Sequence, residues 1–89
     1  MRYGELKLLE RSGAIQGLRL HPAFSVEIAG YPYCTYTADF SYWQRQDGAQ
    51  SVRVVEEIKS TGTAKDTAYR LRKKAAELYH RFQVTEVIR

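Results

Sequence analysis

The chain has 89 residues, of which 44% are hydrophobic and 27% charged, and its formal net charge is +4. This composition is typical of a globular protein, and the length suits a single small domain over residues 1–89. One cysteine and no apolar run of about 18 residues argue against a disulfide framework and against a membrane span. The charged, amphipathic N-terminal residues do not resemble a signal peptide, so we expect a cytoplasmic protein.

The N-terminal third of the chain has two regular patterns. Residues 2–12 are expected to form a helix, because apolar side chains recur every three residues from Tyr3 onward and Gly13 follows as a stop signal. Residues 23–28 alternate between apolar and polar side chains, which predicts a half-buried strand. Residues 29–32 have the composition of the turn that ends this strand.

Three further strands are expected along the chain. Residues 33–43 are rich in Thr, Tyr, Phe and Trp, which predicts a second strand. Residues 46–49 contain an Asp-Gly pair that is typical of a hairpin turn. Residues 51–59 are then expected to form a third strand, and residues 83–89 a short final one.

A second helix is predicted between the last two strands. Its apolar residues form one stripe at spacings of 4, 3, 4, 3 and 4: Ala64, Ala68, Leu71, Ala75, Leu78 and Phe82. Residues 63–66 have the pattern of a capping box at its start. Four cations lie off the stripe and are expected to face the solvent: Arg70, Arg72, Lys73 and Lys74.

The predicted element order is helix, three strands, helix, strand, or αβββαβ. This order predicts an α/β fold of the α+β kind, with a small mixed four-stranded sheet and two helices. The first two strands would be antiparallel, and the last strand would join the sheet edge through the second helix as a crossover.

Positive charge is concentrated in the second helix. Residues 65–81 hold six basic and two acidic side chains, so that this segment alone accounts for the net charge of +4. Such a patch is expected of a protein that binds a phosphate backbone, although a solvated helix face has the same pattern. A domain of this size is also a candidate for a homodimer, because its own core is small.

Acidic residues inside two predicted strands are candidate metal ligands. Asp39 interrupts an apolar and aromatic strand, where a carboxylate needs a partner or a metal. Alternation on the third strand places Glu57 and Lys59 on one face with Val55, and Glu56 on the other. Asp39 and Glu57 could bracket one divalent ion, because Mg²⁺ takes one or two carboxylates together with water and phosphate oxygens. The alternative is a surface ion pair between Glu57 and Lys59.

These residues carry a resemblance to a known family. Asp39 followed by Glu57-Ile58-Lys59, on a hairpin before a basic helix, resembles the PD-(D/E)XK nuclease superfamily, as does the αβββαβ order. The chain is similar to a group of small phage-associated proteins assigned to that superfamily through five segments: 5–11, 20–24, 37–40, 55–59 and 69–74. The resemblance implies a restriction-endonuclease-like core.

The resemblance also implies a metal site. Asp39 and Glu57 would hold Mg²⁺ or Mn²⁺, with the backbone carbonyl of Ile58 as a further ligand. Lys59 would position the attacking water, while the metal lowers the pKa of that water and stabilises charge on the phosphate. Such nucleases usually carry one more acidic ligand on the first helix, and Glu5 would take this place if the helix is shifted.

By the same resemblance, the second helix would bind the DNA backbone through Tyr69, Arg70, Arg72, Lys73 and Lys74. Such contacts carry no base information, so that DNA shape or junction structure would be recognised rather than sequence. The implied function is a metal-dependent DNA endonuclease, acting on branched or junction DNA and often as a dimer. The alternative is a non-catalytic, nuclease-like binding module, such as a phage-encoded inhibitor or adaptor that binds a host protein or a nucleoprotein complex.

Overall fold

The structure, a computed structural model, describes residues 1–46, 50–59 and 67–88, which form two helices and six strands. In chain order the elements are α1 (Arg2–Ser12), β1 (Ile15–Leu20), β2 (Ala23–Ile28), β3 (Tyr31–Thr37), β4 (Phe40–Gln44), β5 (Val52–Lys59), α2 (Thr67–His80) and β6 (Val84–Ile88). The α+β class is confirmed. The predicted order αβββαβ is wrong, because five strands rather than three separate the two helices.

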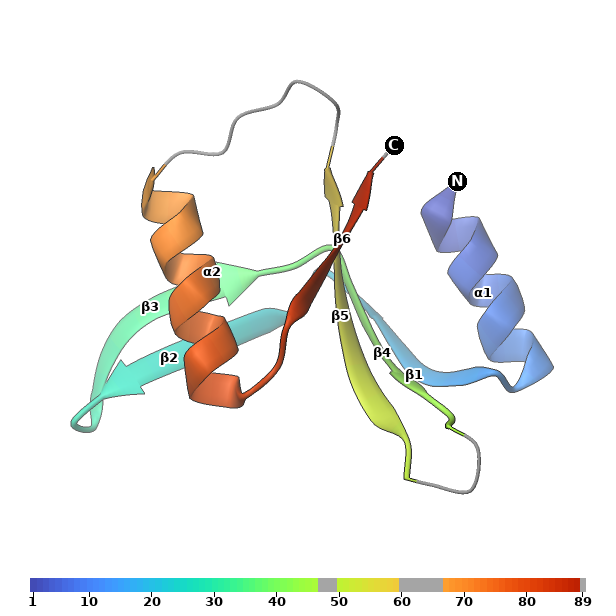
Figure 1. Ribbon diagram of the computed structural model, residues 1–89, viewed down its shortest axis with the longest axis horizontal. Coiled ribbons are helices and arrows are strands. Elements are labelled where there is room, and N and C mark those ends of the chain that lie inside the picture. Colours follow the sequence, from blue (N-terminus) through green and yellow to red (C-terminus); the bar gives the residue numbers. More distant parts are fainter. Residues whose placement is uncertain (47–49, 60–66, 89) are drawn as a thin grey trace.

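A mixed four-stranded sheet forms the centre of the molecule. Its strand order is β1-β4-β5-β6, in which β1–β4 and β4–β5 are antiparallel and β5–β6 is parallel. The expected crossover through α2 is therefore confirmed. Strands β2 and β3 form a separate antiparallel hairpin. Figure 1 shows α1 on one side of the four-stranded sheet, and α2 with the β2–β3 hairpin on the other.

Strand β1 was not predicted from the sequence. Its register against β4 shifts between Gln16 and Arg19, and Gly17 between them has a φ of +65°. This irregularity removes the simple alternation by which a strand is recognised, and among the six residues of β1 only Ile15 is buried.

Residues 33–43 form parts of two strands instead of one. The chain leaves the hairpin at Ala38, whose N–H donates to the carbonyl of Pro22 (3.1 Å). It enters the four-stranded sheet at Asp39, whose N–H donates to the carbonyl of Glu56 (3.1 Å). Asp39, which is unfavourable inside a strand, thus marks the break between β3 and β4. The predicted Asp-Gly turn (47–49) and capping box (63–66) lie outside the described residues.

Two apolar clusters cover the two faces of the four-stranded sheet. On the α1 side the buried residues are Leu6, Ile15, Phe40 and Tyr42. On the α2 side they are Phe24, Val26, Tyr36, Ala38, Val55 and Ala76. The predicted alternation along β5 is confirmed, because Val55 belongs to the second cluster while Val54 and Ile58 pack against the first.

Helix α2 has the predicted spacing, and Ala75 and, just beyond the helix, Phe82 pack against the core as predicted, but another row of residues lies innermost. Leu71 and Leu78, on the predicted core stripe, are 61% and 68% exposed, whereas Ala76 is fully buried. The inward row contains Tyr69, Lys73 and Ala76, again at spacings of 4 and 3. This row faces the sheet because the small side chain of Ala76 permits close packing and because Lys73 pairs with carboxylates on the sheet, as described below.

Candidate functional site

Asp39 lies against the Glu57-Ile58-Lys59 segment. Its carboxylate oxygen Oδ2 accepts a hydrogen bond from the backbone N–H of Ile58 (2.7 Å), and its own N–H bonds the carbonyl of Glu56. The partner that the sequence required for Asp39 is therefore a backbone amide of β5. This bond holds the Asp39 carboxylate beside the residue that links Glu57 and Lys59.

Glu57 is 4% exposed and lies on the α2 face of the sheet. Its Oε1 accepts a hydrogen bond from the hydroxyl of Tyr36 (2.7 Å), and the Nζ of Lys73 lies 4.0 Å from its Oε2. The structure gives Glu57 one neutral donor and one distant cation. A buried carboxylate with such partial compensation keeps a strong attraction for positive charge.

A third carboxylate, Glu86 of β6, lies next to Glu57. The parallel register pairs these two residues directly, so that their side chains leave the same face of the sheet. Lys73 lies 2.7 Å from Glu86, and Lys59 lies 3.6 Å from it. Lys59 therefore pairs with Glu86 rather than with Glu57. We refer to Glu57, Lys59, Lys73 and Glu86 as the β5–β6 cluster.

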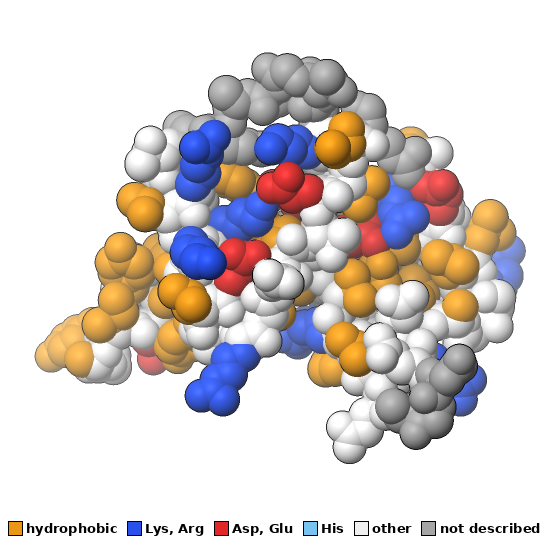
Figure 2. Space-filling view, viewed as in Figure 1, with side chains coloured by type: hydrophobic (Ala, Val, Ile, Leu, Met, Phe, Trp, Pro, Cys, Tyr) orange, Lys and Arg blue, Asp and Glu red, His pale blue; other side chains and the backbone are white. Residues whose placement is uncertain are grey.

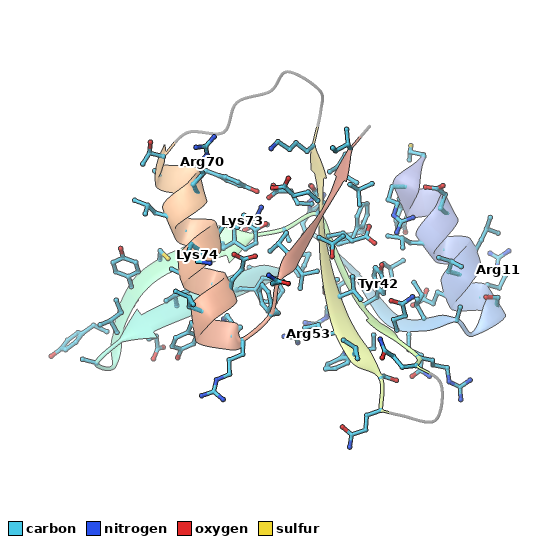
Figure 3. All side chains as sticks on the ribbon, in the orientation of Figure 1. Arg11, Tyr42, Arg53, Arg70, Lys73 and Lys74 are labelled. Carbon is cyan, nitrogen blue, oxygen red and sulfur yellow. The ribbon has the colours of Figure 1, made fainter. Side chains whose placement is uncertain are left out.

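Lys73 does not face the solvent, and the prediction that it does is wrong. Its side chain is 16% exposed and runs from α2 toward the sheet, where two glutamates face the helix (Figure 3). The hydrogen bond and the charge of Lys73 hold the pKa of the Glu86 carboxyl below its usual value. Glu86 was not singled out from the sequence, although an acidic residue between the valines of a short strand is the same signal that indicated Asp39.

The hydroxyl of Tyr36 donates to one predicted metal ligand, Glu57, and its pKa responds to the charge of the other, Asp39. Burial raises the pKa of Tyr36, and its hydrogen bond to Glu57 and the charges of Glu57 and Asp39 raise it further. Both carboxylates thus act on the same hydroxyl group. The hydroxyl of Tyr69 lies 3.5 Å from it, so that this predicted DNA-binding tyrosine belongs to the interior edge of the site.

Glu5 lies with a different set of residues, on the α1 side. Glu56, 1% exposed, accepts two hydrogen bonds from Arg2, at 2.8 Å from Nε and 2.6 Å from Nη2, and a third from the hydroxyl of Tyr42. The Oε1 of Glu5 lies 3.8 Å from Nη1 of Arg2. The structure therefore brings Glu5 toward Glu56 and not toward Glu57, and its role as a metal ligand stays a prediction.

The outer surface of α2 carries the remaining predicted cations. Arg70, Arg72 and Lys74 are exposed, as expected. Figure 2 shows basic side chains gathered over this helix, with acidic side chains among them. A surface for a phosphate backbone would thus use three cations of α2, with Lys73 turned to the sheet.

The residues around Asp39 offer only a small number of oxygen ligands to a divalent cation. Within the described ranges 1–46, 50–59 and 67–88, no group of three or more His, Cys, Asp or Glu side chains could hold a metal ion. The protein atoms that the resemblance names for a metal are the carboxylates of Asp39 and Glu57 and the carbonyl of Ile58. This set matches Mg²⁺ or Mn²⁺, which complete their shells with water and phosphate oxygens.

Comparisons with protein-family models, with curated proteins and with solved structures find no match to this chain. In the part of the chain that the structure describes, neither helix has the length and apolar character needed to cross a membrane.

Proposed function

We propose that this protein is a divalent-metal-dependent DNA endonuclease of the PD-(D/E)XK type. The observation that carries the proposal is the hydrogen bond between the Asp39 carboxylate and the N–H of Ile58 (2.7 Å). It holds an aspartate from the start of β4 beside the Glu57-Ile58-Lys59 segment of β5. This segment carries a second carboxylate and a lysine, and together with Asp39 these are the residue types that metal-assisted phosphodiester hydrolysis needs.

The topology supports a restriction-endonuclease-like core with an inserted hairpin. Setting β2 and β3 aside leaves the order α1-β1-β4-β5-α2-β6, which is αβββαβ. The four remaining strands are also those of the central sheet, in the order β1-β4-β5-β6. In this interpretation, the hairpin is an insertion between the first and second strands of the core.

Each residue of the site has a separate role in the proposal. Asp39, Glu57 and the carbonyl of Ile58 would hold Mg²⁺ or Mn²⁺. The metal would lower the pKa of a bound water and neutralise charge on the phosphate. Lys59 reaches Glu86 at 3.6 Å and is about one third exposed, so that it can turn toward a phosphate at the surface. Tyr36 holds the Glu57 carboxylate in place.

A cleavage assay tests the proposal. Linear, single-stranded and four-way-junction DNA would be incubated with Mg²⁺, Mn²⁺ or EDTA, using the native chain and the variants Asp39→Asn and Glu57→Gln. Both substitutions keep the acceptor that the neighbouring donor uses but remove the negative charge. We expect each to reduce cleavage by about 100-fold or more, the scale of losing one preorganised charge-stabilising group.

Glu27→Gln is the matched control, because Glu27 is an exposed glutamate on the hairpin. It should cleave like the native chain. Cleavage that persists in EDTA, or in both site variants, would refute the assignment of Asp39 and Glu57.

The second candidate function is a non-catalytic binding module on the same fold, such as a phage-encoded inhibitor or adaptor. The observation that favours it is the β5–β6 cluster, in which Lys59 and Lys73 already pair with Glu86 and Lys73 also lies 4.0 Å from Glu57. A retained ion-pair network needs no metal. Absence of cleavage, together with a melting temperature that Mn²⁺ leaves unchanged, would select this function, whereas a metal-dependent rise in melting temperature would select the nuclease.

A further inference from the structure

A groove opens at the end of the molecule away from the β5–β6 cluster. It has a volume of about 820 Å³ and lies where the last turn of α2 and the segment before β6 pass over the start of β5. Strand β6 pairs with β5 only from Val55 onward, so that Val52, Arg53 and Val54 precede this pairing and line the groove. The volume is within the range of about 300–1,000 Å³ that small-molecule sites occupy.

An aromatic ring and a guanidinium group form one wall of the groove. Trp43 of β4 and Arg53 of β5 are directly paired across the sheet, and the guanidinium carbon of Arg53 lies 5.3 Å from the centre of the Trp43 ring. The same guanidinium lies 5.7 Å from the ring of Phe24 (Figure 3 labels Arg53). Arg53 is therefore held between two rings, while Trp43 remains 43% exposed.

The opposite wall adds a second arginine. Arg81 follows α2 directly in a left-handed conformation (φ +59°), and its side chain is exposed. Glu77 also lines the groove, but its Oε2 accepts the backbone N–H of Val84 (2.9 Å). Gln83 contributes an uncharged polar side chain. With two arginines against one glutamate, the charged side chains that line the groove have a net positive charge.

We propose that this groove binds an unpaired stretch of nucleic acid, with a base stacked on Trp43 and the flanking phosphates beside Arg53 and Arg81. An exposed aromatic ring between cationic side chains is how proteins hold single strands without reading their sequence. A base can lie flat on the ring only after it leaves its own stack, so we expect an unpaired strand rather than a duplex.

This inference goes beyond the proposed nuclease, because strand binding here requires neither Asp39 nor Glu57. The two sites do share one face of β5, where Arg53, Val55 and Glu57 alternate with residues of the other face. If the nuclease proposal also holds, the groove places an unpaired strand on the face that carries the cleavage residues. The preferred substrate would then contain a single-stranded segment.

Fluorescence provides a direct test, because Trp43 is the only tryptophan in the chain. The native chain would be titrated with a short oligo-dT in EDTA, so that no cleavage occurs. We expect saturable quenching of Trp43 emission and an affinity that falls with salt. Arg53→Gln and Arg81→Asn should each weaken binding by about tenfold and reduce the slope of log K against log salt by about 0.7, the value for one lost single-strand phosphate contact. Asparagine suits position 81 because it tolerates the left-handed conformation.

Two more variants complete the design. Arg11→Gln removes an exposed arginine at the far end of α1 and should leave the titration unchanged. Trp43→Leu has no tryptophan signal, so its binding would be measured by the anisotropy of a labelled oligo-dT. This variant should bind the oligonucleotide at least about tenfold more weakly, as expected when one stacking partner is lost. Circular dichroism would verify that each variant is folded.

Several results would overturn the proposal. Oligo-dT binding that neither quenches Trp43 nor responds to Arg53→Gln and Arg81→Asn would place the strand elsewhere. Equal quenching by duplex DNA would exclude selection of unpaired bases, and absence of binding would exclude the site. The groove would be a contact between two copies of the chain if the protein forms a dimer, if Leu78→Gln dissociates this dimer, and if dimer formation and oligo-dT binding exclude each other. Glu57→Gln should leave the quenching unchanged, so that failure of the nuclease and failure of the groove are separate outcomes.

Discussion

Replacement of Arg2 by alanine should destabilise the protein strongly, because it leaves a buried charge behind. Glu56 is 1% exposed, and Arg2 supplies two of its three hydrogen bonds. Removing one partner of a buried ion pair costs about 3–5 kcal/mol. The Arg2 side chain is 25% exposed, which indicates the lower end of this range, about 3 kcal/mol. For a domain of this size the melting temperature should fall by roughly 12–24 °C.

The pH dependence of this effect follows from the pKa of Glu56. Burial by itself raises this pKa, but the hydrogen bonds from Arg2 and Tyr42 and the charge of Arg2 outweigh burial and lower it. A depressed carboxyl pKa contributes stability above the unfolded-state value, and this contribution is lost as the pH falls through the folded pKa. Without Arg2, burial is no longer outweighed, so that the pKa of Glu56 rises and stability falls as the pH increases. The difference between native chain and variant should therefore be largest near pH 7 and shrink toward pH 4.

Chemical denaturation followed by circular dichroism at pH 7, 5.5 and 4 would measure this difference. Arg11→Ala, which truncates an exposed arginine in the last turn of the same helix, is the matched control and should cost about 0.5 kcal/mol or less. Arg2→Lys should have an intermediate cost, because it keeps the charge but loses the two-point contact. A cost for Arg2→Ala equal to that of Arg11→Ala, or one that does not vary with pH, would refute the reasoning.

Two other predictions concern α2 and the buried tyrosines. Ala76→Leu should cost about 1–3 kcal/mol through overpacking, whereas Leu71→Gln should change stability by about 0.5 kcal/mol or less, as measured by denaturation; the reverse order would mean that the leucine row faces the core. Burial, followed by a hydrogen bond to Glu56, raises the pKa of Tyr42 to about 12, and the pKa of Tyr36 is raised as well. In an alkaline absorbance titration these two tyrosines should stay neutral above the ordinary tyrosine pKa of about 10, and stability is lost above that pH because the same residues ionise in the unfolded chain. Ionisation of all seven tyrosines in one step near pH 10 would contradict the structure.

Local patterns predicted most of the secondary structure. The helix at 2–12, the strand at 23–28 and the alternation along β5 are confirmed, because each depends on residues close in sequence. Gly13 ends α1 with a φ of +88°, as its stop signal indicated. What local patterns could not reveal is the division of six strands between a hairpin and a central sheet, which depends on long-range pairing such as that of Asp39 with Glu56.

The candidate site was predicted only in part, because it too depends on long-range pairing. Spacing along β5 placed Glu57 and Lys59 on one face, but the partner of Lys59 is Glu86, which is 27 residues further along the chain and adjacent only through the parallel register of β6. The side of α2 that faces the sheet also depends on that register, because it places Glu86 beside Glu57. A helical pattern with two parallel rows does not decide which row faces the sheet, and the decision here lies with the two glutamates that meet Lys73.

Two neighbouring glutamates therefore have opposite physical situations. Glu56 accepts three hydrogen bonds, two of them from one guanidinium, so that its charge is satisfied within the protein. Glu57 has a tyrosine donor and a lysine 4.0 Å away, and Asp39 adds a second negative charge nearby. Because a carboxylate that is already paired gains little from a cation, Glu56 is suited to holding α1 on the sheet. Glu57 retains the uncompensated charge that a divalent ion would stabilise, which is why the metal site is proposed on the α2 face.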